Sequence, residues 1–123
     1  MQENKKQLSM ASDNSQNIQP EQVVIQLIEA MSVNDAAKIR SLFHKDAKQA
    51  YGESGSWKSG EAFFKWLQSD IIDRKGQVDT AKFSADGDKV VVTGQYSSVG
   101  YTNKANFLFS VENGKIKSWQ MRY

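Results

Sequence analysis

The sequence predicts an α+β domain in which three N-terminal helices pack against a strongly curved, mainly antiparallel sheet. Apolar residues recur at helical spacing between Pro20 and Ile72, whereas from Gly76 onward they alternate in period two. The last alternating run is split by Asn113-Gly114, which is a strong signal for a two-residue hairpin loop. Helices followed by consecutive strands are typical of the α+β class.

Length, composition and charge limit the possible functions. The 123 residues, 39% of them hydrophobic, suffice for one domain with a modest core. The 16 basic and 14 acidic residues leave a net charge of +2 and do not cluster, so we expect no nucleic-acid partner. No apolar run approaches the length of about 18 residues that would indicate a membrane span. The absence of cysteine excludes disulfides and thiol chemistry.

Residues 1–19 are rich in Gln, Asn, Ser and Lys, with only Leu8, Met10 and Ile18 to bury. Such a segment cannot offset the entropy lost on ordering, so we expect a flexible tail before a single domain over 20–123. The segment also lacks the apolar stretch of a signal peptide. A cytoplasmic location fits the sequence as written, and an exported protein fits if a leader has been removed.

Two helices are expected at the start of the domain. Pro20 suits a first helical turn, and the helix to Val33 carries an apolar stripe made of Val23, Val24, Leu27, Ile28 and Met31. Asn34 is expected to cap a second helix that ends near His44 and buries Ala36, Ile39, Leu42 and Phe43.

A short strand and a third helix are expected next. Residues 46–55 favour an irregular extended segment, with glycines at two positions. Ser59 is the expected N-cap of the third helix, and Glu61 suits its first turn. This helix is apolar on most sides, so we expect it to plug the open side of a curved sheet; its large residues are Phe63, Phe64, Trp66, Leu67, Ile71 and Ile72.

The remaining chain is predicted to be an antiparallel meander. One strand is expected over Val78–Ser84, a turn at Asp86-Gly87, and a second strand over Lys89–Val99. Gly94 interrupts the second strand, where a bulge or bend is the usual reason.

The Asn113-Gly114 loop sets an expected register for the terminal hairpin. If pairing runs on without interruption from Glu112 opposite Lys115, Phe107 and Phe109 share one face. The other face then carries Leu108, Trp119, Met121 and Tyr123, framed by Lys104 and Lys117. Aromatic residues and methionine inside a charged rim are typical of interfaces, so we expect a homodimer through this outer face.

The order of several segments along the chain is typical of a known superfamily. The paired helices are followed by Leu42-Phe43-His44-Lys45-Asp46-Ala47, a strand that contains glycines, the aromatic helix and an ending that runs from Phe107 to Ile116. Together they resemble the NTF2-like superfamily, in its SnoaL-like branch, over about residues 20–123. The resemblance implies a cone, a curved sheet wrapped round helices with an apolar cavity. Similar proteins include isomerases, dehydratases, polyketide cyclases, epoxide hydrolases, transport adaptors and binding domains, so the fold does not choose a function.

The catalytic groups of two of these families are missing. The position matching the carboxylate base of the ketosteroid isomerases is Tyr51, and a phenol with an ordinary pKa near 10 is a poor proton acceptor at neutral pH. Glu53, two residues on, is expected in a solvated turn. The scytalone dehydratase-like members use paired histidines, whereas this chain has only His44, which suits a helix end.

The catalytic groups of two further families are also missing from this chain. The limonene epoxide hydrolase-like members use two aspartates bridged by arginine on the late strands, which here supply Arg122 and no aspartate. The cyclases similar to SnoaL need an acidic group facing the cavity, where this chain offers the amides Asn106 and Gln120. With one histidine and scattered carboxylates there is no metal-ligand spacing, and we expect no metal and no cofactor.

The favoured hypothesis is therefore a domain of this kind that binds a small hydrophobic ligand without an evident catalytic set. The residues expected to line its cavity are Tyr51, Trp57, Phe64, Tyr96, Phe107, Phe109 and Gln120. The alternative for each aromatic residue is that it simply fills the core. Two other functions stay open: an isomerase or cyclase in which Tyr51 works with Asp70 or Asp73, and a protein-interaction module that uses the outer face of the sheet.

Overall fold

The structure, a computed structural model, describes residues 19–122. Six strands form one sheet in the order β2-β1-β6-β5-β4-β3, and only the β1–β6 pair is parallel. The helical segments are α1 (Pro20–Ser32), α2 (Ala36–Ser41), α3 (Glu61–Trp66) and its continuation η2 (Leu67–Ile72). The strands are β1 (Phe43–Tyr51), β2 (Lys58–Ser59), β3 (Gln77–Asp86), β4 (Lys89–Ser98), β5 (Tyr101–Glu112) and β6 (Lys115–Met121). The α+β prediction is confirmed. The expected tail falls outside the described residues except for Gln19.

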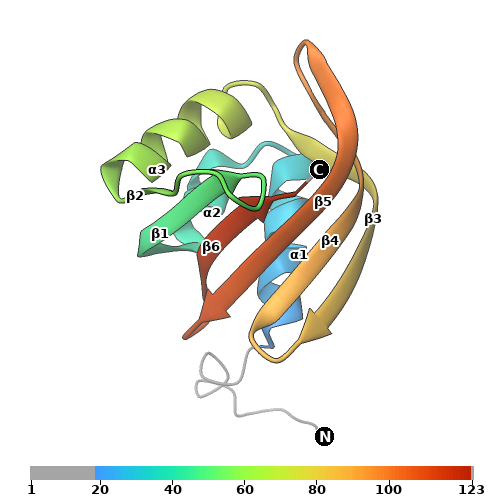
Figure 1. Cartoon of the computed structure of the whole chain (residues 1–123). Helices are drawn as coiled ribbons and strands as arrows, with labels where there is room; N and C mark the ends of the chain where they lie inside the picture. Colours follow the sequence, from blue (N-terminus) through green and yellow to red (C-terminus); the bar gives the residue numbers. More distant parts are fainter. Residues whose placement is uncertain (1–18, 123) are drawn as a thin grey trace, which may run out of the picture.

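The sheet is strongly curved, and its concave side receives the helices (Figure 1). Helix α1 contacts strands β3 to β6, while α3 lies beside β1 and β2. The predicted apolar stripe of α1 is buried, with Val24 and Leu27 fully excluded from solvent. Burial of this stripe, more than intrinsic helix propensity, stabilises α1. Within the described part of the chain, no helix is long and apolar enough to cross a membrane.

The second helix differs from its prediction at both ends. Its N-cap is Asp35, whose Oδ1 accepts from the backbone N–H of Lys38 at 3.1 Å, and Asn34 instead adopts a left-handed conformation with φ 53°. The helix ends before Phe43, which begins β1. The backbone N–H of Ile116 donates to the carbonyl of Leu42 at 2.8 Å, so pairing with β6 draws this segment out of the helix. A distant strand therefore overrides a local helical pattern.

The third helix also starts later and winds differently than expected. Ser59 lies in β2, paired with Lys48, and Gly60 with φ 59° precedes the helix. From Leu67 the winding is π-helical, and the N–H of Asp73 donates to the carbonyl of Gln68 five residues earlier at 2.8 Å. Such wide turns are rare and occur frequently at functional sites.

A bulge bends β3 and β4 where Gly94 predicted one. Asp79 pairs with Gln95 and Lys82 with Thr93, so two residues of β3 lie opposite Gly94 alone. A Cβ on Gly94 would lie 2.7 Å from the carbonyl oxygen of Asp79, and its φ of 152° suits only glycine. The turn that follows β3 is Gly87-Asp88, one residue later than predicted, because Asp86 still pairs with Lys89.

The terminal hairpin begins in the predicted register and then departs from it. Glu112 pairs with Lys115 and Val111 with Ile116, but the register shifts before Ser110, which pairs with Ser118. Phe109 therefore lies opposite Trp119 on the concave face. The predicted placement of Trp119 and Met121 on the outer face was wrong, because one extra residue in β6 reverses every later side chain.

Trp119, which this shift turns inward, belongs to the aromatic core, defined as Phe43, Phe63, Trp66, Phe107, Phe109 and Trp119. Trp119 is fully buried at its centre, with ring centroids 5.0 Å from Phe109, 5.2 Å from Trp66 and 5.4 Å from Phe107. Edge-to-face and tilted pairs of this kind add to the free energy gained by burial. The aromatic core fills the space that the resemblance assigned to a cavity.

The outer face of the sheet keeps little of the predicted interface. Leu108 lies there half-buried, between Val91 of β4 and Gln120 of β6. Its surroundings are polar: Ser110 and Ser118 share a hydrogen bond of 2.5 Å between their hydroxyls. Tyr123 lies outside the described residues. The homodimer therefore stays a prediction, without the aromatic patch that motivated it.

Candidate functional site

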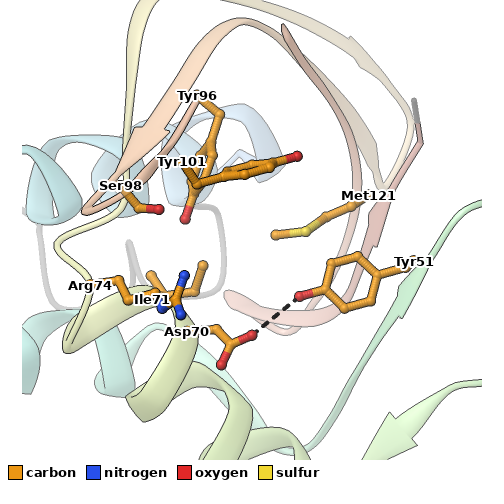
Figure 2. A pocket seen from close by; sticks show the side chains of 8 residues that line it. All are labelled: Tyr51, Asp70, Ile71, Arg74, Tyr96, Ser98, Tyr101 and Met121. Atoms are coloured by element: carbon orange, nitrogen blue, oxygen red, sulfur yellow. Dashed lines mark hydrogen bonds between the residues drawn. The ribbon is translucent and has the colours of Figure 1, made fainter. Parts of the chain in front are cut away.

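A pocket of about 280 Å³ opens beside the aromatic core, between η2 and the ends of four strands. Figure 2 shows three tyrosine rings and Met121 facing a common space from the sheet side, with the helical residues opposite. We call it the tyrosine pocket; its lining residues are Tyr51, Asp70, Ile71, Arg74, Tyr96, Ser98, Tyr101 and Met121.

The helical wall of the tyrosine pocket is set by the π-helical winding of η2. Asp70 and Ile71 lie within this segment, and Arg74 follows its end. The carbonyl of Arg74 accepts from the backbone N–H of Val99 at 2.8 Å, which ties the helix end to the β4–β5 turn. The wall and the strand ends are thereby held together.

The sheet wall depends on a close approach between Tyr96 and Gly76. A Cβ on Gly76 would lie 2.3 Å from the hydroxyl oxygen of Tyr96, so only glycine leaves room for this phenol. Tyr96 is almost fully buried, and its ring lies 5.8 Å from Phe107 and 6.2 Å from Tyr101. Tyr96 therefore joins the aromatic core to the tyrosine pocket.

Tyr51 makes a second link between these two regions. Its hydroxyl accepts a hydrogen bond of 2.7 Å from the Nε1–H of Trp66 and lies 3.5 Å from Oδ2 of Asp70 (Figure 2). The other oxygen of Asp70 accepts from the hydroxyl of Ser69 at 2.7 Å. Lys58 lies over the Tyr51 ring, 4.9 Å from its centroid.

The phenols of Tyr51 and Tyr96 keep their protons at neutral pH. Burial raises the pKa of Tyr51, and the Asp70 carboxylate raises it further, against the opposing hydrogen bond from Trp66. Burial also raises the pKa of Tyr96 to about 12. Tyr96 can therefore donate a hydrogen bond to a bound molecule, and neither Tyr51 nor Tyr96 acts as a base.

The tyrosine pocket offers little acid–base chemistry. Asp70 is its one carboxylate, while Asp73, the other candidate of the enzyme hypothesis, is not in the lining and accepts from Nε2 of Gln68 at 2.6 Å. Between residues 19 and 122 no three potential metal-binding side chains come together. The geometry suits binding, and the enzyme hypothesis stays a prediction.

The comparison with known families bears on residues 24–119, which match the family described as the SnoaL-like domain. This match spans most of the chain. The chain belongs to the SnoaL-like domain family. The NTF2-like resemblance and the cone-shaped fold that it implied are thereby confirmed.

Solved structures show that this SnoaL-like domain has a widely used fold. An NTF2-like protein of unknown function from Cytophaga hutchinsonii has a TM-score of 0.72 at 17% identity, covering 85% of this chain and 88% of the other. A proposed polyketide cyclase from Sinorhizobium meliloti has a TM-score of 0.67 at 21% identity, covering 88% and 98%.

A third similar structure is a computationally designed 17-OHP binder, with a TM-score of 0.69, 18% identity and coverage of 85% and 91%. At these identities the likeness shows the fold alone. No curated protein matches the chain.

Two of the seven ligand-binding residues predicted for this SnoaL-like domain line the tyrosine pocket, namely Tyr51 and Tyr96. Phe107 and Phe109 belong to the aromatic core and are fully buried, and the half-buried Phe64 packs against it. They were expected in a cavity that the aromatic core fills.

The other two predicted residues lie away from the tyrosine pocket. Trp57 is exposed beneath Nζ of Lys48, at 4.6 Å from its ring centroid. Gln120 lies on the outer face, where its Nε2 donates to the carbonyl of Gly52 at 3.1 Å. The register shift in β6 explains why Gln120 was misplaced, because it moved this residue to the opposite face.

Sequence analysis missed Tyr101, Ser98, Ile71 and Arg74, and assigned Met121 to an interface. One signal was available: the aromatic residues of the lining are all tyrosines, whereas those of the aromatic core are phenylalanine and tryptophan. A hydroxyl on an otherwise buried ring needs a polar neighbour or water. Arg74 gave no signal, because its position depends on the π-helical winding.

Proposed function

We propose that this SnoaL-like domain binds a small, largely hydrophobic molecule in the tyrosine pocket. The observation that carries the proposal is the convergence of Tyr51, Tyr96 and Tyr101 with Ile71 and Met121 around one opening. Ring faces and aliphatic groups supply apolar contact, while hydroxyls and two charged groups can fix the orientation of the ligand. Ligand pockets combine these two kinds of group.

The size of the opening restricts the ligand. A volume of about 280 Å³ lies near the lower end of the range for ligand pockets, which is roughly 300–1,000 Å³. A molecule of one or two fused rings matches this volume. The designed 17-OHP binder supports the proposal in general terms, because that protein has a similar fold and was designed to bind a ligand.

Titration with methyl 2-naphthoate, a neutral two-ring probe, tests the proposal through the fluorescence of the probe. Tyr101→Ala is expected to weaken binding by about tenfold, since it removes one ring face from the lining. Trp57→Ala is the matched control, because Trp57 is an aromatic residue as exposed as Tyr101, at 45% and 44%, but lies outside the pocket.

The proposal fails if the wild type does not bind the probe. It also fails if Tyr101→Ala binds as tightly as the wild type, or if Trp57→Ala causes the larger loss. Circular dichroism of each variant separates a loss of binding from a loss of folding.

A further inference from the structure

The charges of the tyrosine pocket point beyond a purely hydrophobic ligand. Asp70 and Arg74 are its two charged lining residues, and they are four residues apart in sequence. On a regular helix, this spacing favours an ion pair. Among residues 19–122 no ion pair within 4.0 Å joins them. Asp70 lies within the π-helical η2 and Arg74 follows its end, so their spacing is not that of a regular α-helix.

The negative charge already has protein partners. Asp70 accepts from the hydroxyl of Ser69 at 2.7 Å and lies within 3.5 Å of the hydroxyl of Tyr51. In Figure 2 its carboxylate turns toward Tyr51. The carboxylate of Asp70 thus already accepts hydrogen bonds from within the protein.

The positive charge of Arg74 has no such partner among the described residues. Within the described residues, the guanidinium of Arg74 forms no hydrogen bond or ion pair, although its backbone is fixed by the bond from Val99. Figure 2 shows this side chain extending from the helical side of the tyrosine pocket, beside Ile71 and on the side where Ser98 lies. A guanidinium offers five N–H donors in a planar fork that matches a carboxylate.

The surrounding hydroxyls favour an anion rather than competing with it. Tyr96 stays protonated at neutral pH and so remains a donor, as does Ser98, whereas the hydroxyl of Tyr51 already donates to Asp70. A bound anion would thus meet one free cation and the hydroxyls of Tyr96 and Ser98. The apolar part of the same molecule would lie against Tyr101, Ile71 and Met121.

We infer that the tyrosine pocket is specific for small aromatic carboxylic acids, with the ring against the tyrosines and the carboxylate held by Arg74. This inference rests on the proposed function and narrows its ligand class. Arg74 is then the residue that selects the ligand, while the rings provide most of the contact area. Charge-assisted, two-point pairing of this kind is roughly twice as strong as a neutral hydrogen bond.

A matched pair of probes tests this inference: 2-naphthoate, which is an anion at neutral pH, and its methyl ester, which has the same ring and no charge. We expect the wild type to bind the acid at least about tenfold more tightly than the ester. Arg74→Gln should abolish this preference, because it should weaken binding of the acid at least about tenfold more than binding of the ester. Arg74→Lys should restore part of it, because the charge returns without the fork.

Lys75→Gln is the control variant. It removes one positive charge at the next position, outside the pocket lining, so it should keep the preference for the acid. The inference is overturned if the wild type binds both probes equally, if Arg74→Gln weakens both to the same extent, or if Lys75→Gln acts like Arg74→Gln. In each of these cases ester binding that depends on Tyr101 would still support the proposed function. Failure of both probes to bind would overturn both.

Discussion

The aromatic core and the tyrosine pocket are neighbouring regions built from the same kind of side chain, yet they serve different ends. In the aromatic core the rings of Phe107, Phe109 and Trp119 are fully buried and pack on one another. In the tyrosine pocket, Tyr51 and Tyr101 are about half exposed and leave an opening between them. The two regions meet at Trp66 and Tyr96.

The difference lies in the hydroxyl group. A ring without one can be surrounded by apolar neighbours, whereas a phenol must place its oxygen beside a donor, an acceptor or water. Strand β5 shows the change along its own length, from Tyr101 at one end to Phe107 and Phe109 further on. Ring burial thus stabilises one region, and incomplete burial leaves the other able to take a ligand.

The largest expected effect comes from breaking the aromatic core. Trp119→Ala removes the ring that four others contact, and we expect it to lower the free energy of unfolding by about 3–5 kcal/mol. Urea denaturation followed by circular dichroism measures this loss. Tyr101→Ala, made in the tyrosine pocket, should cost less than about 1 kcal/mol because its ring is 44% exposed. Equal losses would contradict the division between the two regions.

A moderate effect is expected where the two regions meet. Gly76→Ala places a methyl group 2.3 Å from the hydroxyl oxygen of Tyr96, and the displacement should cost about 1–3 kcal/mol of stability. In a Tyr96→Phe background the same change should cost less, since its closest neighbour is gone. A double-mutant cycle on unfolding free energies measures the coupling. Strictly additive effects would show that Gly76 does not accommodate this phenol.

The smallest effect concerns the proton of Tyr96 and is measurable only in alkali. The pKa of Tyr96 is about 12 in the folded protein, against about 10 for a free phenol, so the unfolded state loses this proton first as the pH rises. The stability contributed by this difference is complete below about pH 10 and is lost between about pH 10 and 12.

Unfolding of wild type and Tyr96→Phe across this range isolates the contribution. The wild type should lose more stability than the variant as the pH rises, and phenolate absorbance should report a late-titrating tyrosine that the variant lacks. Parallel loss of stability in both proteins would mean that Tyr96 does not carry the shift.

Much of the fold could be predicted because it rests on local patterns. The apolar stripe of α1, the Asn113-Gly114 loop and the bend at Gly94 each follow from residues close together in sequence. The family and the curved sheet followed from the order of such segments. Local chemistry and tertiary packing agree at these positions, as they do in most of a foldable sequence.

The remaining features depend on contacts that a sequence pattern does not contain. Phe43 left its predicted helix because β6 pairs with the chain beside it, and Trp119 turned inward because β6 has one unmatched residue. That bulge reversed the predicted interface and moved Gln120 out of the predicted pocket. Arg74 could not be identified as a lining residue because the π-helical winding of η2 places it. Tyr51 and Tyr96 were found as aromatic residues whose positions do not depend on the register of β6.

Strand β6 comes last of the six in chain order but occupies an inner position in the sheet, between β1 and β5. During synthesis, β3, β4 and β5 can form hairpins as soon as they leave the ribosome, whereas β1 has only the two residues of β2 to pair with. The first strand must therefore wait for Lys115–Met121 before it joins the sheet. The two halves of the sheet are therefore joined only by the strand that comes last in chain order, and this pairing between distant segments is of the kind that slows folding.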